Sequence, residues 1–334
     1  MVACTSCNAM ASTYIQARVH QMRYEAAGTL SVELRPLVVV EEFAQPVQAG
    51  AHIDLHLADG LIRSYSLINP GESHRYVVAV SLDPASRGGS RFVHEKLRVG
   101  QVIQISGPRN HFPLVETAPH SVLVAGGIGI TPVLSMLRKL HALGRTAHLI
   151  YCASSRENAA FVPEIEAIAA LAGGRVTVDW HFKDDKGERA DLYSLLQGHA
   201  EGAHFYACGP LVFLASYEDS CQKLGLAHVH LERFAAAPLA VPRTPEVGYA
   251  VELRRTGKTV QVVAGTSLLD TLINAGMNPE YSCREGVCGA CEVRVISGDV
   301  DHRDQILSEQ DRMANKSMMI CVSGCRSGNL VLDY

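Results

Sequence analysis

Residues 281–291 read Tyr-Ser-Cys-Arg-Glu-Gly-Val-Cys-Gly-Ala-Cys, which spaces three cysteines as Cys-x4-Cys-x2-Cys. This is the spacing at which plant-type proteins hold a [2Fe–2S] cluster through cysteine thiolates. A fourth thiolate has to come from farther along the chain, and Cys321 lies in the apolar run 318–322. The stretch therefore predicts a redox-active cluster with four ligands, Cys283, Cys288, Cys291 and Cys321.

Two other interpretations of these cysteines are a structural zinc site and a set of inert buried thiols. Zinc ribbons usually pair two Cys-x2-Cys knuckles, whereas this stretch has one knuckle and an extra thiol before it. Cys325 is a rival fourth ligand, but it lies in the polar stretch 323–326. Gly286 and Gly289 let the backbone wrap closely, so that N–H groups can point at the sulfurs of a negatively charged cluster. We therefore expect the cluster, with Cys321 as its fourth ligand.

The chain has 334 residues, of which 47% are hydrophobic and 19% charged, and its formal net charge is −4. This length suffices for two or three domains. We expect no nucleic-acid partner, because there is no basic footprint, and no membrane association, because no apolar run approaches the ~20 residues of a membrane span. Ten cysteines without a signal-peptide core favour metal ligation in the cytoplasm. Residues 1–12, which include Cys4 and Cys7, are expected to be a flexible tail.

Residues 13–115 alternate apolar and polar positions with a period of two, and Gly and Pro interrupt the pattern every 10 to 20 residues. Several short alternating strands with turn signals predict an antiparallel β-barrel. The expected strands lie at 14–19, 29–34, 52–57, 76–80 and 102–105.

The barrel region contains Arg63-Ser64-Tyr65-Ser66 and, farther on, a predicted helix start at 87–93. An aromatic residue flanked by hydroxyls on a strand can face a flavin ring. Arg63 and the Gly89-Ser90 helix start can hold a phosphate through charge-assisted bonds and free N–H groups. The alternative is an ordinary strand tyrosine and a surface turn.

Residues 116–234 alternate strands with helices, which predicts a parallel sheet covered by helices on both faces. The first strand, 122–125, leads into the glycine turn 126–130, and Thr131 and Pro132 are expected to be the N-cap and first residue of a helix. This order places free N–H groups where a pyrophosphate can bind.

Cys208-Gly209-Pro210 follows the fourth strand of this region, where parallel sheets form ligand crevices. Cys208 can therefore touch a nicotinamide, although a cysteine at a strand end is often only a small buried hydrophobe. The acid that usually marks an NAD site is missing from 151–156, and Arg156 could accept the 2′-phosphate of NADPH.

Residues 235–246 are rich in Ala and Pro and are expected to be a linker. From 247 to 334 the chain has a hairpin around 256–258, a short helix capped by Thr266 or Ser267, and the cysteine stretch. We expect a compact α+β ferredoxin of the β-grasp type.

These three segments in this order resemble the phthalate dioxygenase reductase family, whose flavin and iron–sulfur reductases feed Rieske-type oxygenases. The resemblance covers nearly the whole chain after residue 13. Its motifs are 63–66, 88–91, 107–110, 126–132, 208–210, 232–234 and the cysteine stretch.

The resemblance implies FMN rather than FAD, NADH as the reductant, and a Rieske-type terminal oxygenase as the protein partner. It places Arg63 and Ser90 near the flavin phosphate, and Tyr65, Ser66 and Phe234 near the ring. The full flavin set is Arg63, Ser64, Tyr65, Ser66, Gly88, Gly89, Ser90 and Phe234. The nicotinamide set is Gly126, Gly127, Gly129, Thr131, Pro132, Cys208, Gly209 and Pro210.

We expect a monomeric NADH-dependent reductase that converts two-electron into one-electron chemistry. A hydride passes from NADH to FMN, and single electrons pass through the cluster to the oxygenase. Ser66 and Cys208 are assigned a positioning role near the transferred hydride. The alternatives are a stand-alone NAD(P)H diaphorase or flavin reductase and, as a third interpretation, a redox sensor. The partner is expected to dock on the cluster loop at Arg284, Glu285 and Val287.

Overall fold

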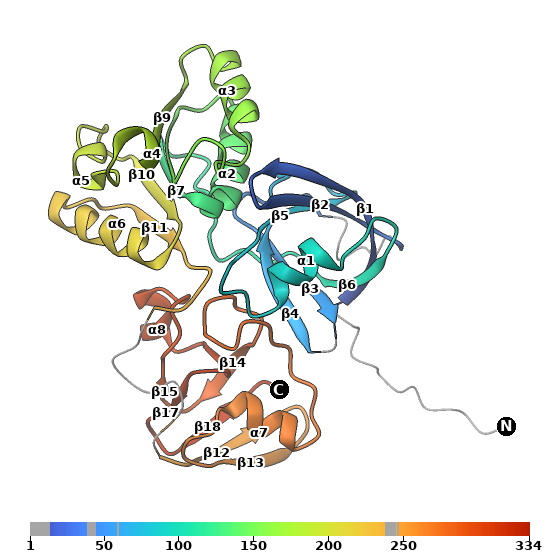
Figure 1. Ribbon diagram of the computed structural model, residues 1–334. Coiled ribbons are helices and arrows are strands. Elements are labelled where there is room, and N and C mark those ends of the chain that lie inside the picture. Colours follow the sequence, from blue (N-terminus) through green and yellow to red (C-terminus); the bar gives the residue numbers. More distant parts are fainter. Residues whose placement is uncertain (1–13, 39–44, 59, 238–244, 246) are drawn as a thin grey trace.

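The computed structural model describes residues 14–38, 45–58, 60–237, 245 and 247–334, which form three folded units (Figure 1). The expected tail 1–12 and most of the expected linker 235–246 lie outside these ranges. The multidomain architecture predicted from the sequence is confirmed: a barrel-like antiparallel sheet, a parallel sheet and a C-terminal α+β domain.

The first unit is a six-stranded antiparallel sheet in the order β4-β3-β6-β1-β2-β5. A bridge between Leu67, just after β4, and Val78 of β5 joins the two edges, so the sheet curls into a barrel. Alternate residues of each strand point into a core that includes Val32, Ile53 and Ile105. Its elements are β1 Tyr14–Ala26, β2 Thr29–Pro36, β3 His52–Ala58, β4 Leu61–Ser66, β5 Tyr76–Ser81, α1 Gly89–Glu95 and β6 Val102–Ser106.

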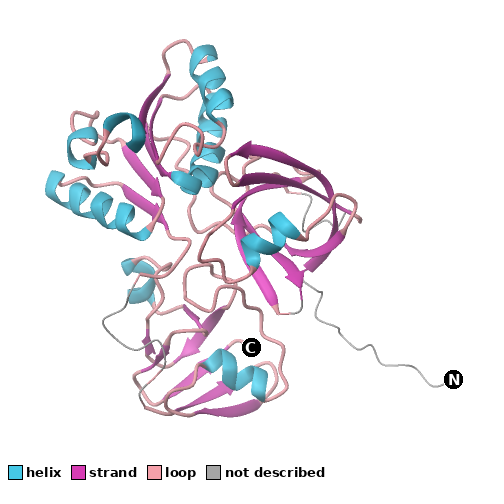
Figure 2. Ribbon diagram, in the orientation of Figure 1, coloured by secondary structure: helices cyan, strands magenta, loops and turns pink. Residues whose placement is uncertain are grey.

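The second unit is a parallel sheet in the order β11-β10-β7-β8-β9, with helices on both faces (Figure 2). One apolar cluster lies beneath α2 and α3, and another beneath α5 and α6. The strands are β7 Ser121–Gly126, β8 Ala147–Ala153, β9 Val176–Phe182, β10 His204–Cys208 and β11 Val229–Glu232. The helices are α2 Ile130–Ala142, α3 Val162–Leu171, α4 Lys183–Lys186, α5 Leu192–Leu195 and α6 Leu211–Leu224.

The start of α2 differs from the prediction. Its N-cap is Gly129, because a short 3-10 turn over Gly127–Gly129 runs directly into the helix at Ile130. Thr131 therefore lies inside the first turn, where its Oγ1 donates to the carbonyl of Ile128 at 3.1 Å, and Pro132 is not the first helical residue. The N-terminal end of the helix still faces the glycine turn.

The third unit surrounds the cysteine stretch. Its main sheet has the order β13-β12-β18-β14-β16, and Ser267 caps α7 by accepting from the N–H of Asp270. The strands are β12 Tyr249–Leu253, β13 Lys258–Val262, β14 Glu292–Ser297, β15 Val300–Asp301, β16 Ser317–Met319, β17 Gly324–Cys325 and β18 Asn329–Leu332. The helices are α7 Leu268–Asn274 and α8 Glu309–Ala314.

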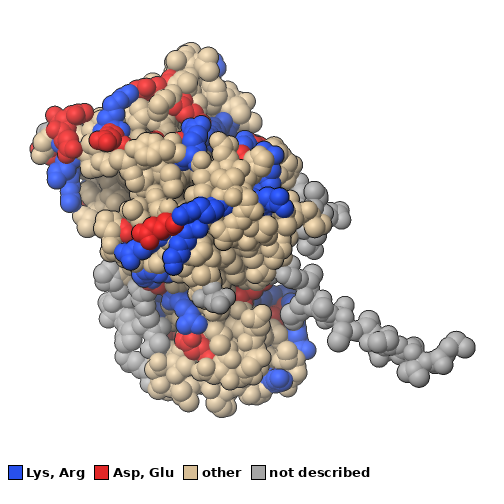
Figure 3. All heavy atoms as spheres, turned by 45° about the vertical axis from the view of Figure 1, so that its right-hand side comes forward, with Lys and Arg blue, Asp and Glu red and all other residues tan. Residues whose placement is uncertain are grey.

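The three units meet around the loop that follows α7, and basic and acidic side chains are interspersed on the face that Figure 3 shows. Among the described helices, none combines the length and the apolar composition that a membrane crossing requires.

Candidate functional site

The four cysteines of the predicted cluster lie together. The Cys283 sulfur is within hydrogen-bonding reach of both Cys288 and Cys321, and Cys321 is within reach of Cys291. Two backbone N–H groups also point at sulfurs: that of Glu285 lies 3.3 Å from Cys283 Sγ and that of Cys283 lies 3.4 Å from Cys288 Sγ. N–H donors around thiolate sulfurs stabilise the negative charge of a ligated cluster.

The backbone of the loop approaches its surroundings so closely that two positions require glycine. Gly286 has a φ of +72°, and a Cβ there would lie 2.7 Å from Val322 Cγ2. Gly289 has a φ of +73°, and a Cβ there would lie 2.1 Å from His111 Nε2. Such φ angles and approaches exclude side chains.

The residues of this site fit a two-iron core. Four thiols, N–H donors and a closely wrapped loop are the groups that such a core needs. Within the described ranges, no group of three or more Cys, His, Asp or Glu side chains is arranged for one metal ion. Cys325 lies apart on β17, where its sulfur is 3.5 Å from Ser327 Oγ.

A cleft joins the barrel, the end of β11 and the cysteine loop. It contains most of the predicted flavin residues together with two of the cluster cysteines. Its lining is His52, Arg63, Ser64, Tyr65, Ser66, Arg87, Glu232, Arg233, Phe234, Ser282, Cys283, Val287 and Cys288. The cleft has a volume of about 80 Å³, well below the ~300 Å³ of an ordinary ligand pocket, and Phe234, which is 42% exposed, is part of its lining.

The predicted phosphate-binding residues are neighbours at one end of the cleft. A Cβ on Gly89 would lie 2.5 Å from Arg63 Cγ, so the arginine stem lies directly on the first turn of α1. The N-cap is Gly88 with a φ of 101°, and the Ser86 hydroxyl just before it accepts from the N–H groups of Gly88 at 3.1 Å and Arg91 at 3.4 Å. The Ser90 hydroxyl donates to Ser86 Oγ at 2.9 Å. The N–H groups of Gly89 and Ser90, at the first two positions of the helix and beside a guanidinium, suit a phosphate.

Glu232 lies at the other end of the cleft and was not among the residues selected from the sequence. Its Oε2 accepts a hydrogen bond from Ser66 Oγ at 3.2 Å, and β11 pairs it with Cys208 on β10. Burial raises the pKa of Glu232 to about 8 and also raises the pKa of the Cys208 thiol. At neutral pH Glu232 therefore holds a proton beside the two residues predicted to position the hydride.

Glu232→Gln should flatten the pH dependence of stability. The unfolded carboxyl loses its proton near pH 4.5 and the folded one near pH 8, so the native state binds more protons between these values and stability falls as the pH rises through them. The loss should be on the order of 1–2 kcal/mol, because water reaches part of the residue. Urea unfolding at pH 5 and pH 8.5 measures it. Glu201→Gln, in an exposed turn, should keep the wild-type slope, and an equal slope in Glu232→Gln would contradict the assignment.

The glycine turn after β7 and the segment after β10 are in direct contact. A Cβ on Gly129 would lie 2.2 Å from the Cys208 carbonyl oxygen, and one on Gly209 would lie 2.7 Å from Phe213 Cδ1. Gly126, Gly127, Thr131 and Pro210 belong to the same two segments, so the predicted nicotinamide residues form one continuous edge. This edge lies at the carboxyl ends of the parallel strands, the usual ligand crevice of such sheets.

The sequence left open whether Arg156 could bind a 2′-phosphate. Its Nη2 lies 2.5 Å from Glu166 Oε1, and its guanidinium lies over the Trp180 ring at 6.0 Å from the centroid. Because a carboxylate already neutralises it, Arg156 is a weaker phosphate site than its position alone suggested.

The barrel holds the cysteine loop through three side chains. His52 Nε2 is 3.0 Å from the carbonyl oxygen of Cys288, Ser64 Oγ is 3.1 Å from Ser282 Oγ, and Arg87 pairs with Glu285 at 2.5 Å. Burial, aided by Arg109, lowers the pKa of His52 to about 4, so the ring is neutral. Sequence reasoning missed this role because His52 and Cys288 are far apart in the chain.

The solvent exposure expected at 284–287 is found at Arg284, whereas Glu285 and Val287 are only partly exposed. Glu285 pairs with the barrel, and Val287 lines the cleft. Arg284 is exposed, but it pairs with Asp270 and lies over the Tyr281 ring. Most of this loop tip faces the barrel.

Two family models match the chain. Residues 251–326 match a 2Fe-2S iron-sulfur cluster binding domain, and residues 123–219 match an oxidoreductase NAD-binding domain. These matches cover the region of the cysteine loop and most of the parallel-sheet unit.

Whole-length relatives are also found. The chain is 45% identical over 320 residues to the phenoxybenzoate dioxygenase subunit beta of Ectopseudomonas oleovorans, covering 96% of this chain and 97% of that protein. It is 44% identical to the tetrachlorobenzoquinone reductase of Sphingobium chlorophenolicum, covering 96% and 98%. Among solved structures, phthalate dioxygenase reductase, described as a modular structure for electron transfer from pyridine nucleotides to [2Fe–2S], is 32% identical, with a TM-score of 0.65 and coverage of 96% and 98%.

Proposed function

The chain belongs to the phthalate dioxygenase reductase family, and from that premise we propose that it passes electrons from NADH through FMN and a [2Fe–2S] cluster to a Rieske-type terminal oxygenase. It is an oxidoreductase with NAD-binding and 2Fe-2S domains. The choice of FMN and of a Rieske-type partner is the proposed part.

One observation carries the proposal: five of the eight predicted flavin residues and two of the cluster cysteines line the same cleft. Bound FMN supplies the chemistry of this site, because a flavin can accept electrons as a pair and release them singly. The protein's task is to hold the three redox groups in sequence and to shield the transfer from water. The shared lining of the cleft would place a bound flavin beside Cys283 and Cys288.

Each end of the cleft has its own role. Arg63 and the first turn of α1 would bind the flavin phosphate. Burial raises the pKa of Tyr65 to about 12, so its hydroxyl stays neutral beside the ring. Ser66 and Cys208 would orient the nicotinamide and the ring, and Glu232 Oε2 holds Ser66 by accepting from its hydroxyl.

The cluster would be held by Cys283, Cys288, Cys291 and Cys321. We propose that the working units are an FMN-binding barrel (13–115), an NAD-binding domain (116–234) and a [2Fe–2S] domain (247–334). We further propose that the protein acts as a monomer. Its thiolate ligands favour a reducing compartment, the cytoplasm.

NADH should be preferred over NADPH, and Glu166→Gln should narrow the preference. Removing the carboxylate frees the Arg156 guanidinium for a 2′-phosphate. The gain in kcat/KM for NADPH should be about fivefold, the size that an exposed ion pair allows. Steady-state kinetics with both nucleotides measure it. The double variant Arg156→Ala/Glu166→Gln should lose the gain, and a gain that persists there would rule out Arg156.

An anaerobic titration with NADH tests the proposed function. Absorbance follows the flavin, low-temperature electron paramagnetic resonance follows the reduced cluster, and the flavin is identified after release. We expect the flavin to bleach together with the appearance of a rhombic [2Fe–2S] signal. Bleaching without that signal in iron-replete protein would leave a simple flavin reductase.

A quinone reductase is the second candidate, favoured by the 44% identity to tetrachlorobenzoquinone reductase. A small quinone could take electrons from the flavin directly, without the cluster. Comparing tetrachlorobenzoquinone reduction in the wild type with that in a cluster-free variant separates the two. Equal rates would show that the cluster is not needed for this acceptor.

A further inference from the structure

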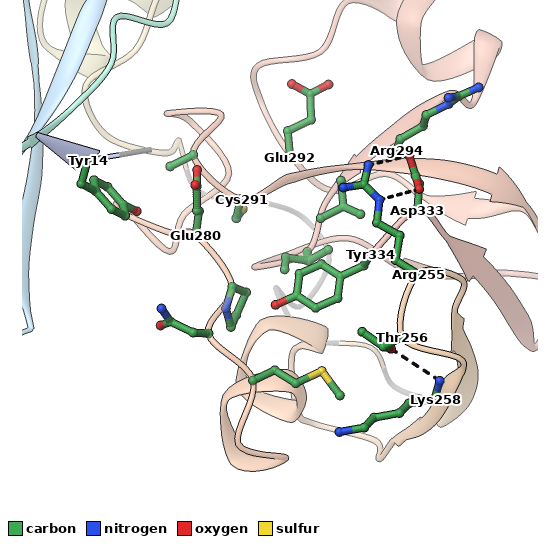
Figure 4. A pocket seen from close by; sticks show the side chains of 16 residues that line it. Tyr14, Arg255, Thr256, Lys258, Glu280, Cys291, Glu292, Arg294, Asp333 and Tyr334 are labelled. Atoms are coloured by element: carbon green, nitrogen blue, oxygen red, sulfur yellow. Dashed lines mark hydrogen bonds and ion pairs between the residues drawn. The ribbon is translucent and has the colours of Figure 1, made fainter. Parts of the chain in front are cut away.

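The cluster cysteines lie between two hollows on different sides. The flavin cleft contacts Cys283 and Cys288. A larger groove of about 710 Å³ contacts Cys291 and Ile320, the neighbour of Cys321, and its lining includes none of the flavin residues (Figure 4). Electrons that enter the cluster from the cleft would therefore leave most directly through the groove.

The floor of the groove is apolar. Its lining includes Cys291 together with Met277, Pro279, Val293 and Ile320. Tyr14 and Tyr334 also line the groove (Figure 4). Tyr14 belongs to the barrel, so the groove spans the edge between the barrel and the cluster domain. An apolar surface next to a redox centre excludes water when a partner covers it.

One wall of the groove and its continuation carry an excess of positive charge. Lys258 and Arg294 line the groove, and Arg294 and Lys316 line an adjoining hollow of about 500 Å³. All three are exposed, and no described acidic side chain lies within ion-pair distance of any of them.

Two of the three acids in the same wall already have partners. Asp333 is held by two hydrogen bonds from Arg255, at 2.8 and 2.9 Å, and Glu292 accepts from Ser317 Oγ at 2.5 Å. The third acid, Glu280, lies on the opposite side with Tyr14 (Figure 4). The Ser317 hydroxyl leaves the Glu292 carboxylate charged, so the two hollows together have four basic side chains against three acidic ones. The wall with Lys258, Arg294 and Lys316 keeps a small positive excess that can attract an acidic surface.

We propose that this groove is the docking surface for the electron-acceptor protein, and that the acceptor presents an acidic rim around its own redox centre. The inference rests on the proposed function, because it assigns the exit for electrons that enter from the flavin cleft. A small apolar floor with charges at its rim suits the brief encounters of electron-transfer partners, which bury little area and depend on electrostatic steering.

The test compares two double charge reversals. Lys258→Glu/Lys316→Glu changes the groove wall, and Lys96→Glu/Lys223→Glu makes the same change on exposed lysines of the barrel and the nucleotide-binding domain. Each protein is reduced with dithionite and mixed with cytochrome b5, an acidic haem protein, in a stopped-flow instrument at low salt. The dithionite is removed by anaerobic gel filtration before mixing, so that cytochrome b5 takes its electrons from the protein and the measurement is independent of NADH.

We expect the groove variant to reduce cytochrome b5 at least about tenfold more slowly than the wild type and the control variant to stay within about twofold. The wild-type rate should fall steeply with added NaCl. Equal rates in the two variants, or a rate insensitive to salt, would overturn the proposal. A second experiment mixes each protein with NADH and tests the proposed function separately. If the proposed function is wrong, NADH will not reduce the cluster in the wild type or in either variant.

Discussion

Replacing Cys321 with serine should abolish NADH-dependent electron transfer to one-electron protein acceptors while leaving flavin reduction by NADH intact. The Cys321 sulfur lies within reach of Cys283 and Cys291, so it belongs to the group that would hold the two irons. Loss of an outer hydrogen bond to a metal ligand already costs roughly 10- to 100-fold in affinity or activity, and loss of the ligand itself should cost more. We expect a fall of at least about 100-fold in cytochrome c reduction, together with loss of the [2Fe–2S] absorbance.

Cys325→Ser is the matched control. Cys325 lies four positions farther along and is the rival fourth ligand by sequence, but its sulfur faces Ser327 rather than the other cysteines. This variant should keep its iron content and its cytochrome c activity. If Cys325→Ser loses the cluster and Cys321→Ser retains it, the assignment of the fourth ligand is reversed.

Much of the fold follows from local sequence patterns. Period-two alternation located the barrel strands, for example 52–57, which becomes β3 His52–Ala58. The spacing of Cys283, Cys288 and Cys291 indicated the cluster loop, because ligands on one loop are fixed by chain geometry alone. Helix starts were less reliable. Thr131 looked like an N-cap, but the 3-10 turn before it extends the helix back to Ile130, and no local signal distinguishes the two.

The contacts between domains could not be predicted in this way. His52 and Cys288 are 236 residues apart, and Ser66 and Glu232 are 166 apart. A strand pattern shows which face of a strand is buried, but it does not show which domain covers the edge. The basic wall could not be predicted either, because Lys258 begins the edge strand β13 and Lys316 directly precedes the other edge strand, β16, and both look like ordinary surface charges in the sequence.

Gly129→Ala should disrupt the nicotinamide site, because the glycine turn at this position packs directly against the backbone of Cys208. A Cβ would lie 2.2 Å from the Cys208 carbonyl oxygen and 2.4 Å from its carbon. Neither atom can turn away as the end of a side chain could, so β7 and β10 would have to separate. Overpacking of this kind costs about 3 kcal/mol or more. We expect a lower melting temperature, measured by thermal unfolding, and a higher KM for NADH.

Gly127→Ala separates this steric effect from the conformational one. Gly127 has a φ of +56°, which alanine disfavours, but no atom lies within 4 Å of a Cβ there. Its cost should be about 1–2 kcal/mol. Gly129 has an ordinary φ of −60°, so alanine at that position is penalised only by contact with Cys208. Comparable losses in the two variants would mean that backbone conformation limits the turn. A much larger loss at Gly129 would show that the close approach of the two strand ends builds the site.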